Sequence, residues 1–202
     1  MARRRRLRWV IDTMVVIRGA RAFRQQPPVP TTPELRLLLG WINGEAPFDW
    51  LLSLPILEEY RDVLRRLQVP GHAVGRFINL LRQAAIEVVA RDLGSFSPDP
   101  DDDPFYHCAI AGHADAIVTD NVTDFPPVPG RKRPAILTPA AAVAQLWKTE
   151  APSDRGPRRT DPRARVGPLR RLACARHAAA EVLHRVPAGD LEAHPQRHRV
   201  RR

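Results

Sequence analysis

Residues 99–125, DPDDDPFYHCAIAGHADAIVTDNVTDF, carry the most specific pattern in the chain. Their first six residues form an acidic, Pro-rich turn that does not continue a regular element. We expect a short helix of small and apolar residues over FYHCAIAGHA (105–114) and a short buried strand over DAIVTD (115–120). Because polar residues follow this strand directly, the strand would bring reactive side chains to one end of a sheet.

The same alternation of strand and helix extends outward from this stretch. Three further short apolar strands are predicted at LRWVID (7–12), DWLLS (49–53) and IEVVA (86–90). Helices with apolar residues at helical spacing are predicted over 33–44, 55–67, 72–84 and 139–148. Strands that alternate with helices favour an α/β fold in which helices cover both faces of a central parallel sheet.

The basic charge of the chain is concentrated at its ends. Lys and Arg number 32 against 22 Asp and Glu, a net charge of +10. Residues 151–202 contain 13 Arg and 5 acidic residues, so they alone carry +8. We therefore predict a domain over 7–149 and an Arg- and Pro-rich extension over 150–202, mostly disordered, in which 168–186 can form a short helix. The extension either holds RNA through its arginines or has no selected role.

Composition excludes several classes of protein. The chain has no run of about 18 apolar residues that could span a bilayer, and Asp12 interrupts the apolar stretch after the basic N-terminus. Cys108 and Cys174 lie far apart and give no disulfide framework. We therefore expect a cytoplasmic protein with no membrane partner.

Acidic residues recur where the predicted strands end or the following helices begin. They are Asp12, the pair Glu58 and Glu59, the group 99–103, and the pair Asp120 and Asp124. The carboxyl ends of parallel strands meet at one edge of a sheet, where active sites lie. Two unit charges ~4 Å apart repel by roughly 4 kcal/mol at an effective dielectric near 20, so such a cluster favours a compensating cation.

Oxygen ligands select Mg²⁺ or Mn²⁺, and these ions assist the hydrolysis of phosphodiesters. Taken one at a time, the same acids are also typical of helix caps and turns. Only their joint placement favours a metal-dependent site.

Four stretches resemble PIN-domain proteins in order and spacing, above all the bacterial toxin components of toxin–antitoxin pairs. They are VIDTMVVIRG (10–19), SLPILEEYRDVLRR (53–66), residues 99–125 and ILTP (136–139). The resemblance covers about residues 8–147 and implies a three-layer, PIN-like α/β fold. It also implies a Mg²⁺- or Mn²⁺-dependent endoribonuclease acting on single-stranded RNA, a cognate antitoxin partner and a homodimer.

By this resemblance, four acids form a catalytic and metal-binding quartet: Asp12, Glu59, Asp102 and Asp124. Four further polar residues are expected to support the quartet: Thr13, Asp103, Thr119 and Asn121. Glu59 is preferred to Glu58 because it lies six residues after Ser53, as in the family pattern. Asp102 is preferred to Asp103 by alignment through DPDD, and a one-residue ambiguity between the two stays open.

Met14 departs from the family pattern, which usually has Asn at this position. The amide of Asn helps to hold neighbouring carboxylates, and a thioether cannot replace its hydrogen bonds. Two hypotheses therefore stay open. In the first the chain cleaves RNA, and in the second it is a weak or inactive PIN-like module that binds RNA or an antitoxin.

Overall fold

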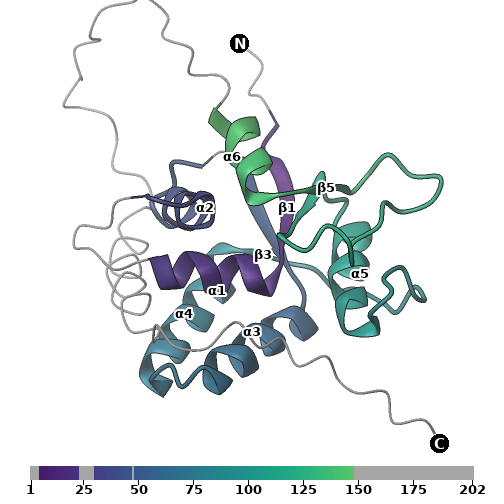
Figure 1. Ribbon diagram of the computed structural model, residues 1–202. Helices are drawn as coiled ribbons and strands as arrows, with labels where there is room; N and C mark the ends of the chain where they lie inside the picture. Colours follow the sequence, from purple (N-terminus) through teal and green to yellow (C-terminus); the bar gives the residue numbers. More distant parts are fainter. Residues whose placement is uncertain (1–4, 23–29, 47, 148–202) are drawn as a thin grey trace, which may run out of the picture.

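The computed structural model describes residues 5–22, 30–46 and 48–147. Its centre is a five-stranded parallel sheet in the order β3-β2-β1-β4-β5 (Figure 1). The strands are β1 (Leu7–Ile11), β2 (Phe48–Leu52), β3 (Ile86–Glu87), β4 (Ala116–Val118) and β5 (Ala135–Leu137). The predicted α/β fold with a central parallel sheet is thus confirmed. The predicted extension over 150–202 lies outside the described residues.

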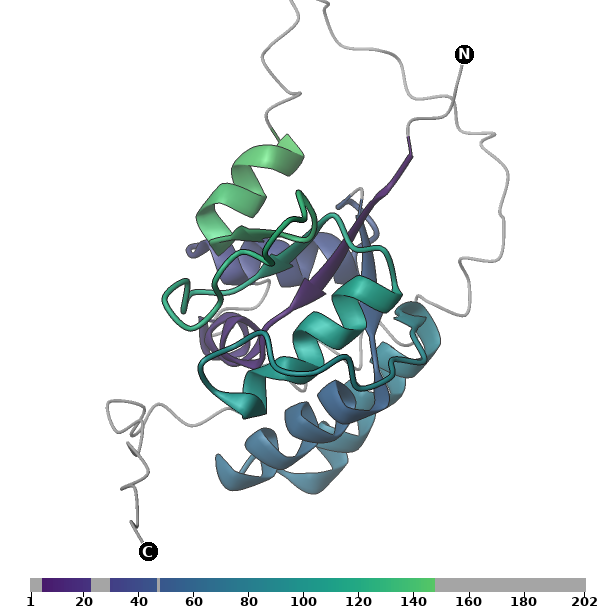
Figure 2. The same cartoon turned by 90° about the vertical axis from the view of Figure 1, so that its right-hand side faces the viewer.

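Helices lie on both sides of this sheet. They are α1 (Thr13–Ala22), α2 (Pro33–Ile42), α3 (Leu54–Arg66), α4 (Gly71–Ala84), α5 (Asp103–Ala111) and α6 (Pro139–Trp147). α5 packs against β1, β2 and β4 on one face, while α2 packs against α1 and α6 on the other (Figure 2). α3 packs against α4, α1 and α5. Within the described ranges, no helix is both long enough and apolar enough to cross a bilayer.

Large aromatic side chains fill the interior around β1 and β2. Trp9 and Phe48 stack with 4.9 Å between ring centroids, and Trp41 meets Trp50 edge-on at 4.9 Å. A central parallel strand is covered on both faces and must be apolar at successive positions. Residues 9–11 of β1 are accordingly all buried. This strand therefore lacks the alternation of apolar and polar residues that marks a strand with one solvent-exposed face.

Helix α1 was not predicted from the sequence. It begins directly after Asp12, and its β-branched residues 15–17 resemble the continuation of a strand. These three side chains are buried in the core, and α1 packs against α2. Packing therefore overrides local propensity at this point.

The edges of the sheet also differ from the prediction. The strand predicted over 86–90 contains only Ile86–Glu87, because its partner β2 ends at Leu52 and offers no further backbone to pair with. Val89 is left 89% exposed. β5 was not predicted as a strand, since three residues are too few to show a period.

Gly19 lets α1 and α2 approach closely. A Cβ atom at this position would lie 2.5 Å from Leu38 Cδ1 and 3.0 Å from the backbone oxygen of Glu34. We predict that Gly19→Ala lowers the free energy of unfolding by about 1–3 kcal/mol, the usual cost of overpacking.

Gly75 provides the matched control, because it lies inside helix α4 and a Cβ atom there would meet nothing within 4 Å. Gly75→Ala should raise the free energy of unfolding by about 0.5–1 kcal/mol through helix propensity. Urea unfolding measures both variants. A stabilised Gly19→Ala protein would show that the helices are not in tight contact at this point.

Candidate active site

The carboxylate of Asp12 lies at the centre of the candidate site. Ile11 of β1 pairs with Val118 of β4, so the residues after the two strands lie side by side. Asp12 Oδ2 accepts a hydrogen bond of 2.7 Å from Thr119 Oγ1, and Asp12 Oδ1 accepts one of 3.2 Å from the backbone N–H of Met14. Only 6% of Asp12 is exposed, and this burial raises the pKa of its carboxyl group.

Helix α3 holds Glu59 next to Asp12. Thr13 donates a hydrogen bond of 2.6 Å from Oγ1 to Glu59 Oε1. The hydroxyl of the buried Tyr60 donates to the last backbone oxygen of β1, which fixes α3 against the end of that strand. Burial raises the pKa of Glu59 to about 7, and the charge of Asp12 adds to this effect. Its neighbour Glu58 is exposed.

The carboxylate of Asp103 is hydrogen-bonded to backbone groups of the preceding loop. Its Oδ1 accepts hydrogen bonds from the backbone N–H groups of Phe96 (2.7 Å) and Ser97 (2.9 Å). Burial alone would raise the pKa of Asp103, but these two hydrogen bonds, together with the Ser95 hydroxyl and the charge of His107, hold the pKa below its usual value. Asp103 therefore anchors the loop before the acidic turn, and it is not free to point at Asp12.

Asp102 is half-buried at the end of a short 3-10 turn, Pro100–Asp102. Its pKa is raised to about 7, chiefly by burial. Four negative charges add to the shift, those of Asp12, Asp99, Glu59 and Asp124. Asp102 therefore lies within electrostatic reach of the three other acids of the expected quartet.

The loop after β4 positions Asp124. Asn121 donates from Nδ2 to Asp124 Oδ2, and its backbone N–H donates to Thr119 Oγ1 at 2.9 Å. Ser97 donates from Oγ to the backbone oxygen of Asp124 at 2.7 Å. Thr119 and Asn121 thus connect Asp12 to Asp124. Ser97 could not be identified from the sequence, because a serine in an irregular loop is common.

Two acids of the original groups have other partners. Asp120 forms an ion pair of 2.9 Å with Arg18 of α1, a helix that the sequence pattern did not reveal. Asp99 accepts a hydrogen bond of 3.0 Å from the backbone N–H of Asp101 and so caps the 3-10 turn. The cap interpretation that applies to single acids therefore holds for Asp99.

The donor set fits a hard divalent cation held mainly by water. Asp12, Glu59 and Asp102 come from three separate elements, supply only oxygen, and all have raised pKa values. Across the described residues, no group of three or more His, Cys, Asp or Glu side chains lies close enough to enclose a metal ion. Mg²⁺ needs no such cage, because it usually keeps several waters and binds one or two carboxylates.

Comparison with known proteins identifies the family. The family model of the PIN domain matches residues 8–123, more than half of the chain. The chain therefore belongs to the PIN domain family, whose members are generally nucleases acting on phosphodiester bonds and typically use divalent metal ions. No curated protein and no solved structure matches the chain. The matched residues include Asp12, Glu59 and Asp102, and the match ends one residue before Asp124.

The raised pKa values predict how stability depends on pH without metal. A carboxyl group whose folded pKa is about 7 and whose unfolded pKa is about 4 binds protons better in the folded state. Its contribution to stability is present below pH 4 and is lost as the pH rises to about 7. We predict that Asp102→Asn in EDTA at pH 8 raises Tm by about 2–4 °C, which corresponds to about 1 kcal/mol after allowance for solvent screening.

The same substitution should have little effect on Tm at pH 4. Glu58→Gln serves as the control because Glu58 is exposed, and it should change Tm little at either pH. Adding Mg²⁺ or Mn²⁺ at pH 8 should raise the Tm of the wild-type chain more than that of Asp102→Asn. A lower Tm for Asp102→Asn in EDTA at pH 8 would contradict the mutual repulsion of the acids.

Proposed function

We propose that this chain is a Mg²⁺- or Mn²⁺-dependent endoribonuclease that hydrolyses single-stranded RNA. The observation that supports the proposal is the electrostatic interaction of Asp102 with Asp12, Glu59 and Asp124, acids that come from four separated segments near the carboxyl ends of β1 and β4. The choice of single-stranded RNA rests on the resemblance to toxin components of toxin–antitoxin pairs. Asp12, Glu59, Asp102 and Asp124 would hold the ion, directly or through its waters.

In this proposal the bound ion supplies an activated water and stabilises the negative charge that develops on the phosphate. The protein supplies orientation and a proton acceptor. Thr119 fixes Asp12, Thr13 fixes Glu59, and Asn121 fixes Asp124. Without the ion the pKa of Glu59 is about 7; the positive charge of the ion would lower this pKa and keep Glu59 ionised, so that it would be able to accept a proton from water at neutral pH.

Asp12→Asn tests the proposed activity. Removal of an outer-shell partner in a metal site costs about 10–100-fold in activity. We predict that Asp12→Asn lowers the cleavage rate by at least this factor. Cleavage of a labelled single-stranded RNA is measured with Mg²⁺, Mn²⁺ and EDTA, beside double-stranded RNA and single-stranded DNA. Glu58→Gln is the control and should keep the wild-type rate, because its side chain is exposed. Cleavage at the wild-type rate by Asp12→Asn would point to a contaminating nuclease.

The alternative function is an inactive PIN module that binds RNA or an antitoxin without cleavage, and Met14 is the residue that favours it. Without the Asn amide, Asp12 and Asp124 nevertheless keep other hydrogen-bond donors. The backbone N–H of Met14 still donates to Asp12, and Asn121 holds Asp124. We therefore favour hydrolysis over binding alone.

Met14→Asn separates the two functions. If the site is catalytic and only weakened by the thioether, an amide at this position should increase the rate of RNA cleavage several-fold, within the about 10–100-fold range of outer-shell effects. The measurement is kcat with Mn²⁺ for both proteins. RNA binding by both proteins, with no cleavage by either under any metal, would support the alternative.

We also propose that the chain is the toxin of a toxin–antitoxin pair and forms a homodimer. Both statements rest on the resemblance stated for residues 8–147. They are independent of the hydrolytic chemistry, so the cleavage experiments stand without them.

A further inference from the structure

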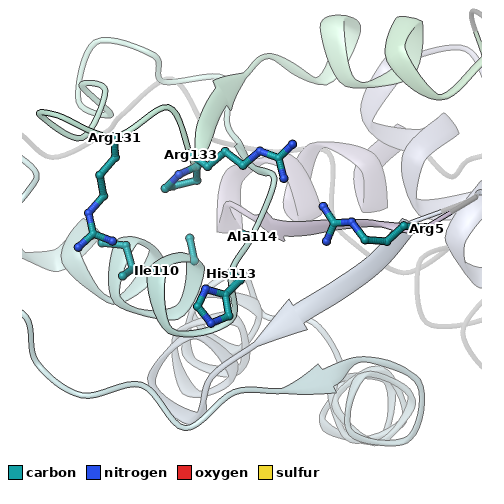
Figure 3. A pocket seen from close by; sticks show the side chains of 8 residues that line it. Arg5, Ile110, His113, Ala114, Arg131 and Arg133 are labelled. Atoms are coloured by element: carbon teal, nitrogen blue, oxygen red, sulfur yellow. The ribbon is translucent and has the colours of Figure 1, made fainter.

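The end of the sheet opposite Asp12 carries a basic pocket with a volume of about 480 Å³. It lies at the amino ends of β1, β4 and β5, beside the last turn of α5. It is lined by three arginines and one histidine, Arg5, Arg131, Arg133 and His113 (Figure 3), and by apolar residues that include Ile110 and Pro134.

A single buried carboxylate, that of Asp115, accepts hydrogen bonds from two of these arginines and orients their side chains. Asp115 is 8% exposed, and its Oδ1 accepts hydrogen bonds from Arg5 Nη2, at 2.5 Å, and from Arg133 Nη1. Its Oδ2 is taken by the backbone N–H of Arg8 at 2.9 Å. The two guanidinium groups point toward one another (Figure 3). They remain more than half exposed, so most of their N–H donors are available to a ligand.

The arginines of the pocket carry more positive charge than the neighbouring carboxylate neutralises. Among the described residues the guanidinium of Arg131 has neither an ion-pair nor a hydrogen-bond partner, and Figure 3 shows its side chain reaching from its loop toward Ile110. Three arginines line the pocket and one carboxylate, Asp115, pairs with two of them, which leaves a formal charge of +2. None of the described residues that line the pocket is acidic. This charge is a fixed feature of the folded surface and favours an anionic ligand.

The end of α5 does not oppose an anion here. The carbonyl groups of a helix C-terminus carry partial negative charge when they are free. In α5 three of the last four carbonyl oxygens, at residues 108–110, accept hydrogen bonds from the backbone N–H groups of residues 112–114. The guanidinium groups therefore dominate the field in the pocket.

From this geometry we propose that the pocket binds a nucleotide, with its phosphate on exposed guanidinium groups of the pocket and its nucleoside against the apolar lining residues between them. Planar guanidinium groups bind phosphate oxygens in pairs and also stack on flat rings. A volume of about 480 Å³ exceeds what a phosphate alone would fill and lies in the range of small-ligand sites. The nucleotide is either free or the phosphorylated end of an RNA chain. The site is independent of the proposed hydrolysis, which takes place at the other end of the strands.

The proposal is tested by calorimetric titration of the full chain in EDTA, which keeps metal-bridged phosphate out of the acidic site. The probes are adenosine and uridine 5′-monophosphate, with adenosine and inorganic phosphate as comparisons. Arg131→Gln removes the unpartnered charge without touching the Asp115 contacts. Lys132→Gln is the matched control, because Lys132 is the exposed neighbour and does not line the pocket. Both substitutions remove the same charge, so binding to arginines elsewhere in the chain cancels between them.

We expect the monophosphates to bind more tightly than adenosine or inorganic phosphate. Arg131→Gln should weaken nucleotide binding at least tenfold, and Lys132→Gln less than twofold. An RNA hexamer with and without a 5′-phosphate identifies the source. Tighter binding of the phosphorylated hexamer than of free nucleotide, with the same dependence on Arg131, assigns the RNA end, and the reverse order assigns the free nucleotide.

Four results would overturn the assignment: no binding of any phosphorylated probe, inorganic phosphate bound as tightly as nucleotide, equal losses in the two variants, or a hexaglutamate peptide bound as tightly as nucleotide. The last result would indicate an acidic protein segment as the ligand. None of these outcomes bears on RNA cleavage, which depends on Asp12.

Discussion

The hydrogen bond from the Thr119 hydroxyl to the buried Asp12 carboxylate depends on the parallel register of β1 and β4, and the rest of the acidic site follows from it. The Thr119 hydroxyl also accepts a hydrogen bond from the backbone N–H of Asn121, and the side-chain amide of Asn121 donates to Asp124. On the other side, α1 begins where β1 ends, and its first residue, Thr13, holds Glu59. A slip of one residue between the strands would turn Thr119 to the opposite face of the sheet.

All five strands point the same way, so the two ends of the sheet differ in chemistry. Carboxylates gather at the carboxyl ends and arginines at the amino ends. Arg6 and β1 separate Arg5 from Asp12, and the five residues of β1 span about 17 Å. The net charge of +10 hides this separation, because it averages over both ends and over residues 151–202. The proposed cation site and the proposed nucleotide pocket therefore lie at opposite ends of the sheet.

The sequence predicted the site residues that follow directly after strands. It did not distinguish residues whose roles depend on the direction of their side chains. Asp12 and Thr119 follow buried apolar runs, and such runs indicate strands. Asp102 and Asp103 could not be separated in this way, because adjacent acids look alike until Asp103 is seen to accept two backbone N–H groups. The basic pocket gave no signal at all, since Arg5 and Arg131 are far apart in the chain and only the fold brings them together.

The central claim is that the acids at the end of β1 hold one divalent cation site. Anomalous diffraction from crystals grown with Mn²⁺ at pH 8 tests this claim most directly. We expect an anomalous peak with carboxylate oxygens of Asp12 and at least one of Glu59, Asp102 and Asp124 within about 2.0–2.3 Å, or bridged to it by water. Crystals at saturating Mn²⁺ in which the only peaks lie away from Asp12 would show that these acids do not form a cation site.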